Sequence, residues 1–238
     1  MDYAAHVAAV ERELASIDAA LRAGPMDATV PTCPDWRLRD LAAHLGDFTA
    51  LWTHLLCEAT GRDKTPFSAV PGDDEIPDWY QQLGADLLAL LEATPADTEV
   101  WTWLPEDQSA RFAARRCANE LAVHRYDAQT ISGTTEPIEA ELAVDGIEEI
   151  FVMVGARDDH DGGGRSLHLH STDRGDEWTI VMGSDGLDVR REHARADLAL
   201  VGAVSDLELL LYQRPPIGPV ERHGDGAALD AWYREFTF

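Results

Sequence analysis

The spacing of apolar residues over the first two thirds of the chain is the feature that most restricts its fold. In residues 2–23 apolar side chains recur at intervals of four and three, which places them on one stripe of a helix. Further segments of helical spacing run from Thr32 to about Ala59 and over 78–93, 109–131 and 138–156. Residues 1–157 are therefore expected to form an all-α domain.

The start of the second helical segment has a specific signature. T-C-P-D-W at 32–36 resembles a capping box, with Thr32 followed three residues later by Asp35. Pro34 suits the first turn of a helix. The sequence predicts that the helix begins here, and that a loop rich in Pro, Gly and Asp follows it from about 61 to 77.

The pattern changes after D-D-H-D-G-G-G-R at 158–165, which is typical of a linker. Beyond it, strands are predicted at 166–171, 177–182, 187–191 and 196–201, with a hairpin turn at 183–186 and helices at 205–212 and 226–235. The prediction is an α+β chain of two domains, an all-α domain at 1–157 and a small α+β domain at 158–238.

The charge of the chain is strongly negative, with 44 acidic residues against 19 basic ones. Such a surface repels nucleic acid and anionic membranes, so neither is an expected partner. No basic segment followed by an apolar block opens the sequence, which indicates a cytoplasmic protein. An anionic substrate would need local arginines to overcome the overall field, and both a monomer and a dimer are compatible with the sequence.

The three cysteines, Cys33, Cys57 and Cys117, match no disulfide framework and no C-x-x-C site. Reduced thiols that pack as small apolar residues are expected, and no protein nucleophile is assigned.

His44 is expected to point into the helical domain. At 100° per residue it lies about 60° from Leu41, about 40° from Phe48 and about 20° from Leu51, in the middle of the apolar stripe. An inward histidine is either a hydrogen-bonded core residue or a metal ligand.

Glu120 and His124 lie four residues apart in the fourth helical segment. Side chains at this spacing stack about 6 Å apart and can bind one ion, although the same face would also suit solvent. Together with His44 they form a set of two nitrogen donors and one oxygen donor that leaves coordination positions open, as in catalytic zinc sites. Asp127, one turn from His124, is a candidate for orienting a ligand or an arginine, or an exposed helix charge.

Several blocks of the sequence resemble the mycothiol-dependent maleylpyruvate isomerase family. They are V-P-T-C-P-D-W-R-L-R-D-L-A-A-H-L-G at 30–46, R-R-C-A-N-E-L-A-V-H-R-Y-D-A at 115–128, and the later L-H-L-H-S-T-D and A-D-L-A-L-V-G-A-V-S-D-L-E-L-L-L. The resemblance covers nearly the whole chain. It implies a DinB-like four-helix bundle of the up-down-down-up type, followed by the C-terminal α+β domain of that family.

The resemblance also implies a metal site and a reaction. The ligands that match by motif are His44, Glu120 and His124, with zinc as the expected metal and nickel as the alternative. The metal lowers the pKa of a thiol, mycothiol, and the thiolate adds to the cis double bond of a conjugated keto-acid, which rotates and re-forms trans.

An arginine of the C-terminal domain is implied near the mouth of the site. Arg214, in L-L-L-Y-Q-R-P-P, is the nearest match, and Arg125 and Arg39 are further candidates for binding substrate or thiol. Each of the three is equally compatible with a surface or salt-bridging role.

Three functions are compatible with these residues. The first is a metal- and thiol-dependent isomerase or thiol S-transferase acting on a small, anionic molecule. The second is a metal-dependent hydrolase that uses a metal-bound water. The third is a non-catalytic module that binds a metal or small molecule, which a fourth protein ligand such as His54 or Asp127 would favour.

His168 and His170 lie two residues apart on one predicted strand. A pair of this kind can bind metal, but no third ligand lies nearby in the sequence. Both are therefore predicted to be surface residues, as is His160 in the linker.

Overall fold

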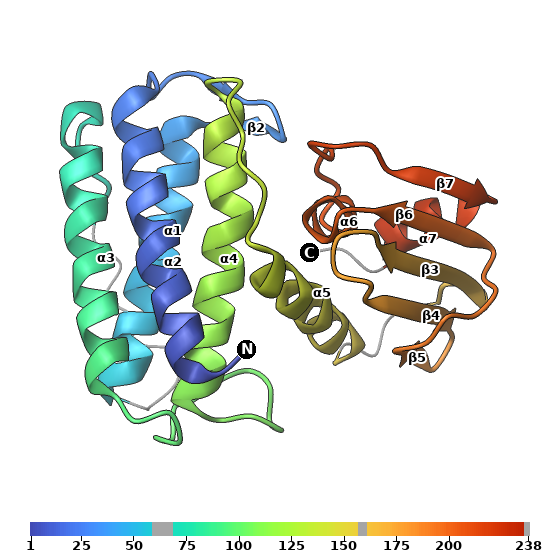
Figure 1. Cartoon of the computed structure of the whole chain (residues 1–238). Helices are drawn as coiled ribbons and strands as arrows, with labels where there is room; N and C mark the ends of the chain where they lie inside the picture. Colours follow the sequence, from blue (N-terminus) through green and yellow to red (C-terminus); the bar gives the residue numbers. More distant parts are fainter. Residues whose placement is uncertain (59–68, 157–160, 236–238) are drawn as a thin grey trace. The chain divides into compact units, whose positions relative to one another are not determined.

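The computed structural model describes residues 1–58, 69–156 and 161–235, and the chain divides into two compact units between Glu136 and Pro137 (Figure 1). The first unit is helical, and the second combines a sheet with helices. The predicted α+β fold class is therefore confirmed. His160 and residues 61–68 of the predicted loop lie outside the described residues.

Four long helices form the first unit: α1 (Tyr3–Ala23), α2 (Leu38–Glu58), α3 (Ile76–Ala93) and α4 (Ala110–Thr130). Both α1 and α2 pack against α3 and α4. The Tyr3 hydroxyl at the start of α1 donates to the carbonyl of Leu91 near the end of α3, so these two helices are antiparallel. The four helices run up, down, down and up, as the resemblance implied (Figure 1).

The prediction for the start of α2 was wrong. Residues Cys33–Arg37 form a strand, β2, that pairs with β1 (Thr29–Val30), and the helix begins at Leu38. Near the start of the helix at Leu38, the side-chain acceptor is Asp40 rather than Thr32. The Asp40 carboxylate accepts a hydrogen bond from the Arg37 amide at 2.9 Å. A proline is compatible with an edge strand as well as with a first helical turn, so Pro34 did not distinguish the two.

The second unit contains a sheet of order β5-β4-β3-β6-β7. Its strands are β3 (Arg165–Ser171), β4 (Glu177–Gly183), β5 (Gly186–Arg190), β6 (Leu198–Gly202) and β7 (Glu221–Gly224). β3 and β6 are parallel, and the other neighbours are antiparallel. The predicted hairpin at 183–186 is present, with Gly183 opposite Gly186. Strand β7, whose residues are all exposed, was not predicted from the sequence.

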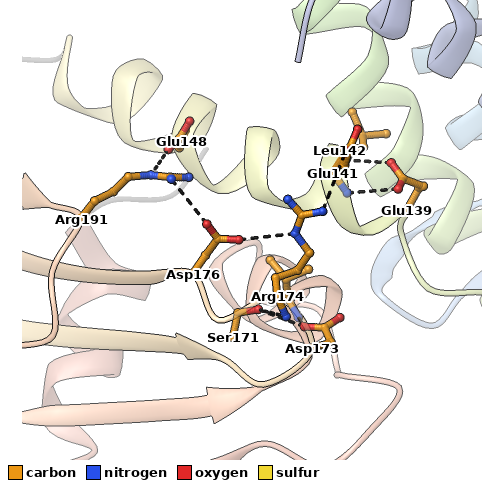
Figure 2. Close-up of polar contacts among 10 residues, drawn as sticks. Glu139, Glu141, Leu142, Glu148, Ser171, Asp173, Arg174, Asp176 and Arg191 are labelled. Atoms are coloured by element: carbon orange, nitrogen blue, oxygen red, sulfur yellow. Dashed lines mark hydrogen bonds and ion pairs between the residues drawn. The ribbon is translucent and has the colours of Figure 1, made fainter.

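The helices α5 (Ala140–Gly155), α6 (Val204–Leu211) and α7 (Ala227–Glu235) complete the second unit. α5 packs against α6, and ion pairs connect it with the sheet (Figure 2). Arg191 donates to Glu148 of α5 at 2.5 Å, and Arg174 lies 3.9 Å from Glu141. The division between units therefore lies before α5. The boundary predicted from the sequence was at residue 157, after this helix. Helical spacing identifies a helix but does not show which element the helix packs against.

No helix in the described part of the chain combines the length and the apolar character needed to cross a bilayer.

Close packing between α2 and α3 depends on a glycine. A Cβ atom at Gly46 would lie 2.0 Å from the Cη2 atom of Trp79 and 2.7 Å from its Cζ2 atom. The indole ring therefore occupies the space that any other residue at position 46 would need. The contact lies half a turn beyond His44, so it also holds the segment of α2 that presents this histidine.

We expect Gly46→Ala to lower the free energy of unfolding by about 1–3 kcal/mol, the usual cost of overpacking a core. Gly155→Ala in α5 is the matched control, because a Cβ there meets no atom within 4 Å. The control should stabilise the helix by up to about 1 kcal/mol through helix propensity alone. Chemical denaturation measures both, and equal effects of the two substitutions would contradict the packing interpretation.

Candidate metal centre

Two neighbouring helices bring the three predicted ligands together. His44 lies in the second turn of α2, and Glu120 and His124 lie one turn apart in α4. The two helices are in contact. α4 is buried on nearly all sides, which explains why its apolar pattern did not show which face points inward.

The donor atoms of these side chains converge. Glu120 Oε1 lies 3.1 Å from His44 Nε2 and 3.4 Å from His124 Nε2. The ring centroids of the two histidines are 4.8 Å apart, and one ligand atom from each of the three residues falls within 4.8 Å of the others. Two donors bound about 2.1 Å from a tetrahedral zinc lie about 3.4 Å from each other, so the three side chains fit one divalent ion with small adjustments.

The carboxylate of Asp127 contacts the imidazole of His124. Its Oδ2 atom lies 2.8 Å from His124 Nδ1, and the carboxylate is fully buried. An Nδ1–H that donates to Asp127 leaves the lone pair of His124 on Nε2, the atom that faces Glu120. The Cys33 thiol also donates to Asp127 Oδ2, at 3.7 Å.

Arg116 holds the other oxygen of Glu120. Its guanidinium pairs with Oε2, one turn earlier on the same helix, and its side chain is 9% exposed. Oε1 is thereby directed to the two histidines. Arg116 was not predicted as a site residue, although the Arg-x-x-x-Glu spacing on the helix was a visible signal of this pair.

Trp36 of β2 lies beside the two imidazoles, with ring centroids 5.1 Å from His44 and 6.2 Å from His124. Placing Trp36 here is a consequence of the strand at 33–37 that the sequence analysis did not predict. The side chain of His44 remains 37% exposed, so a small molecule can reach the group of donors from this side.

The environment keeps His44 neutral. Burial of part of the ring, followed by the neighbouring His124, lowers the pKa of His44 from its ordinary value of 6.5 to about 4. A neutral imidazole with a free lone pair is the form that binds a metal.

The two further ligands considered from the sequence do not join the group. His54 follows His44 by ten residues on the same helix, which corresponds to about 15 Å along the axis. Asp127 is engaged with His124. Within the described residues, the group that includes His44 therefore consists of three side chains.

The three candidate arginines have different surroundings. Arg125 is 3% exposed and donates to Glu13 Oε2 at 2.9 Å and to the Glu136 carbonyl at 2.6 Å. Arg39 is 42% exposed and pairs with Asp73. Arg214 belongs to the second unit, where its guanidinium donates to the Tyr212 carbonyl. A role in substrate binding stays a prediction for all three.

Comparison with known proteins identifies a family and solved structures that are similar to this chain. The model of the mycothiol maleylpyruvate isomerase N-terminal domain matches residues 7–129, which is more than half of the chain and includes all three candidate ligands. A search of curated proteins finds no match.

Two solved structures share the fold. They are the mycothiol-dependent maleylpyruvate isomerase, with a TM-score of 0.68, and a variant of it in which alanine replaces a histidine, with a TM-score of 0.69. In each case the identity is 14% and the match covers 93% of both chains. The chain belongs to the mycothiol maleylpyruvate isomerase N-terminal domain family.

Proposed function

We propose that the protein is a metal-dependent enzyme that uses mycothiol, a low-molecular-weight thiol, in an isomerisation or a thiol S-transfer on a small anionic molecule. The observation that carries this proposal is the convergence of His44 Nε2, His124 Nε2 and Glu120 Oε1 beside a partly exposed imidazole. Membership of the family, and the thiol dependence stated for the solved enzyme of the same fold, support it.

The number of donors favours an enzyme over a structural metal site. Structural zinc normally has four protein ligands, whereas catalytic zinc has three and an open position. His54 is too far along α2 to be a fourth ligand, and Asp127 instead orients His124. Three donors with one accessible side leave room for a thiol or a water.

The residues around the donors have different roles in such a site. A divalent ion held there would act as a Lewis acid and lower the pKa of a thiol or water that reaches it. Asp127 fixes the tautomer of His124, and Arg116 holds Glu120 in place. The exposed side of His44 is the side from which a thiol would enter.

The cysteines of the chain are not required as nucleophiles. Cys117 is buried, and Cys33 donates to Asp127. Cys57 is exposed, but it follows His44 by thirteen residues on α2, which corresponds to about 20 Å. An external thiol is therefore a better nucleophile for this site than any of the three.

An anionic substrate needs a cation close to the metal, because the net charge of the chain is −25. In the unit that holds the metal ligands, Arg39 has the more accessible guanidinium, while Arg125 is committed to a buried ion pair with Glu13. Arg39 is accordingly a better candidate than Arg125 for binding the anion, and Arg214 stays the candidate that the family resemblance implies.

His44→Ala and His124→Ala should each reduce the zinc bound by untagged protein, purified without chelator, by one equivalent per chain. The tripod of His44, Glu120 and His124 loses most of its zinc affinity when it loses one donor. Elemental analysis after equilibrium dialysis measures the loss, and circular dichroism verifies the fold. His223→Ala, at an exposed histidine of β7, is the matched control and should retain the wild-type amount. Unchanged zinc in both tripod variants would contradict the site.

Asp127→Asn is a finer test of the same centre. The amide preserves the shape of the side chain but weakens the hold on His124, so zinc affinity should fall by about 10–100-fold while the stoichiometry at saturation is retained. An unchanged affinity would mean that Asp127 does not position a ligand.

The reaction itself is tested with zinc-loaded protein, mycothiol and a panel of small cis-unsaturated keto-acids and electrophiles, followed by chromatography. We expect turnover that requires the thiol and falls at least about 100-fold in His44→Ala, since a metal contributes several kcal/mol to such a barrier. Metal-dependent turnover of ester or amide substrates without thiol would instead support the hydrolase. Absence of any turnover in either panel would overturn the enzymatic proposal.

The metal-free protein should show a specific pH dependence. The pKa of His44 is about 4 when folded and near 6.5 when unfolded, so only the unfolded chain takes up this proton between those values. The contribution of His44 to stability is thus present above pH 6.5 and lost as the pH falls towards 4. On acidification from about pH 7 to about pH 5, the free energy of unfolding should fall more in wild type than in His44→Gln.

Denaturation curves of chelator-treated protein measure this difference. His223→Gln is the control, and its stability should follow the wild-type pH profile. Parallel profiles for wild type and His44→Gln would show that His44 does not resist protonation in the folded state.

A further inference from the structure

A second group of imidazole and carboxylate side chains lies in the other unit. His168, Glu177 and His193 each place one donor atom within 4.8 Å of the others. Glu177 Oε2 lies 2.8 Å from His168 Nε2 and 2.6 Å from His193 Nδ1. His170 Nδ1 lies 3.5 Å from the second oxygen, Oε1, of the same carboxylate.

This arrangement corrects the prediction from the sequence. His168 and His170 were expected to be surface residues without a third ligand. The side chain of His170 is 37% exposed, as predicted, but His168 is only 4% exposed. The other members of the group are Glu177 of the neighbouring strand β4 and His193 of the loop after β5. Spacing along the chain does not reveal that these residues meet His168.

The register of the sheet explains why these residues meet. His170 pairs with Glu177, and His168 pairs with Thr179, across the antiparallel β3–β4 ladder. Paired residues point to the same face, and residues two apart on a strand share that face. The other face bears the buried apolar residues Leu167, Leu169, Trp178, Ile180 and Met182. The histidines are therefore on the polar face of the sheet.

The loop after β5 is held against this face from both sides. Thr179 Oγ1 donates to the carbonyl of Glu192 at 3.0 Å, next to His193. Arg191 turns to the opposite side, where it lies over Trp178. Its guanidinium pairs with Glu148 and Asp176 (Figure 2). These contacts fix the backbone on either side of residue 192, so His193 is presented to Glu177 by an anchored loop.

We propose that His168, Glu177 and His193 form a second site for a divalent first-row metal ion such as zinc, with His170 as the fourth ligand. Imidazole nitrogens together with a carboxylate oxygen are donors that suit zinc, nickel and copper. Two donors on one zinc lie about 3.4 Å apart, so opening the present contacts of 2.6 and 2.8 Å requires shifts below about 1 Å.

The exposures of the side chains fit a site that an ion can enter. His168 is held inside, whereas the side chain of His193 is 74% exposed and can rotate to admit the ion. A fourth donor from His170 would complete a closed set, which is typical of structural zinc. The expected role is to fasten the 191–193 loop to β3 and β4. This role is independent of the function proposed for the first unit.

The test uses untagged full-length protein in which His44→Ala and His124→Ala remove the first tripod. After treatment with chelator, the protein is dialysed against Zn²⁺ and its zinc content is measured. We expect one equivalent per chain, falling to background when His193→Gln or His168→Gln is added. His223→Gln is the control, because His223 is an exposed histidine of the same sheet that also contacts a glutamate, Glu221, and it should not change the zinc content.

The two substitutions protect the test from a folding artefact. His168 is buried, so His168→Gln could lose zinc through misfolding, but His193 is exposed and His193→Gln should leave the fold intact. Absence of zinc in the background protein, or its retention in both added variants, would overturn the second site. A wild-type protein that binds one equivalent, lost only with His193→Gln, would establish this site and refute the first.

Discussion

The antiparallel packing of α2 against α4 is the constraint on which the candidate metal centre depends. It sets His44 of one helix opposite the Glu120–His124 turn of the other, and three donors converge that are far apart in sequence. The packing in turn requires that α2 keep its position, which the contact of Gly46 with Trp79 of α3 secures. Fold and site are thus connected through a few close helix contacts.

The electrostatics of this centre are consistent with a bound cation. Burying a carboxylate between helices costs free energy unless charges or hydrogen bonds compensate for it. Arg116 compensates one oxygen of Glu120, and the other faces two histidines, of which His44 is kept neutral by burial. A divalent ion at this position would compensate the second oxygen and use the lone pairs of both rings.

The convergence of His44, Glu120 and His124 could be predicted from the sequence because helical periodicity is a strong and local signal. The inward direction of His44 and the shared face of Glu120 and His124 both follow from 100° per residue, and Asp127 lies one turn further. The residues that the sequence missed depend on tertiary packing. Trp36 approaches the site only because 33–37 is a strand, and His193 meets His168 only through strand register and an anchored loop.

Prediction of the boundary between the two units is limited in the same way, because the boundary depends on tertiary packing. The apolar stripe of α5 correctly predicted a helix, but it did not indicate that the helix packs on α6 and pairs with Arg174 and Arg191. The local sequence pattern identifies a helix or a strand. Which other element it packs against depends on side chains that are distant in sequence.

X-ray absorption at the zinc edge is the most direct test of the central claim, that two histidines and one carboxylate hold a metal with a position open to a thiol. It should be recorded on the His193→Gln protein, in which only the first site remains. The account predicts nitrogen and oxygen neighbours at about 2.0–2.1 Å, and one sulfur at about 2.3 Å after mycothiol is added. A spectrum unchanged by the thiol would contradict the account.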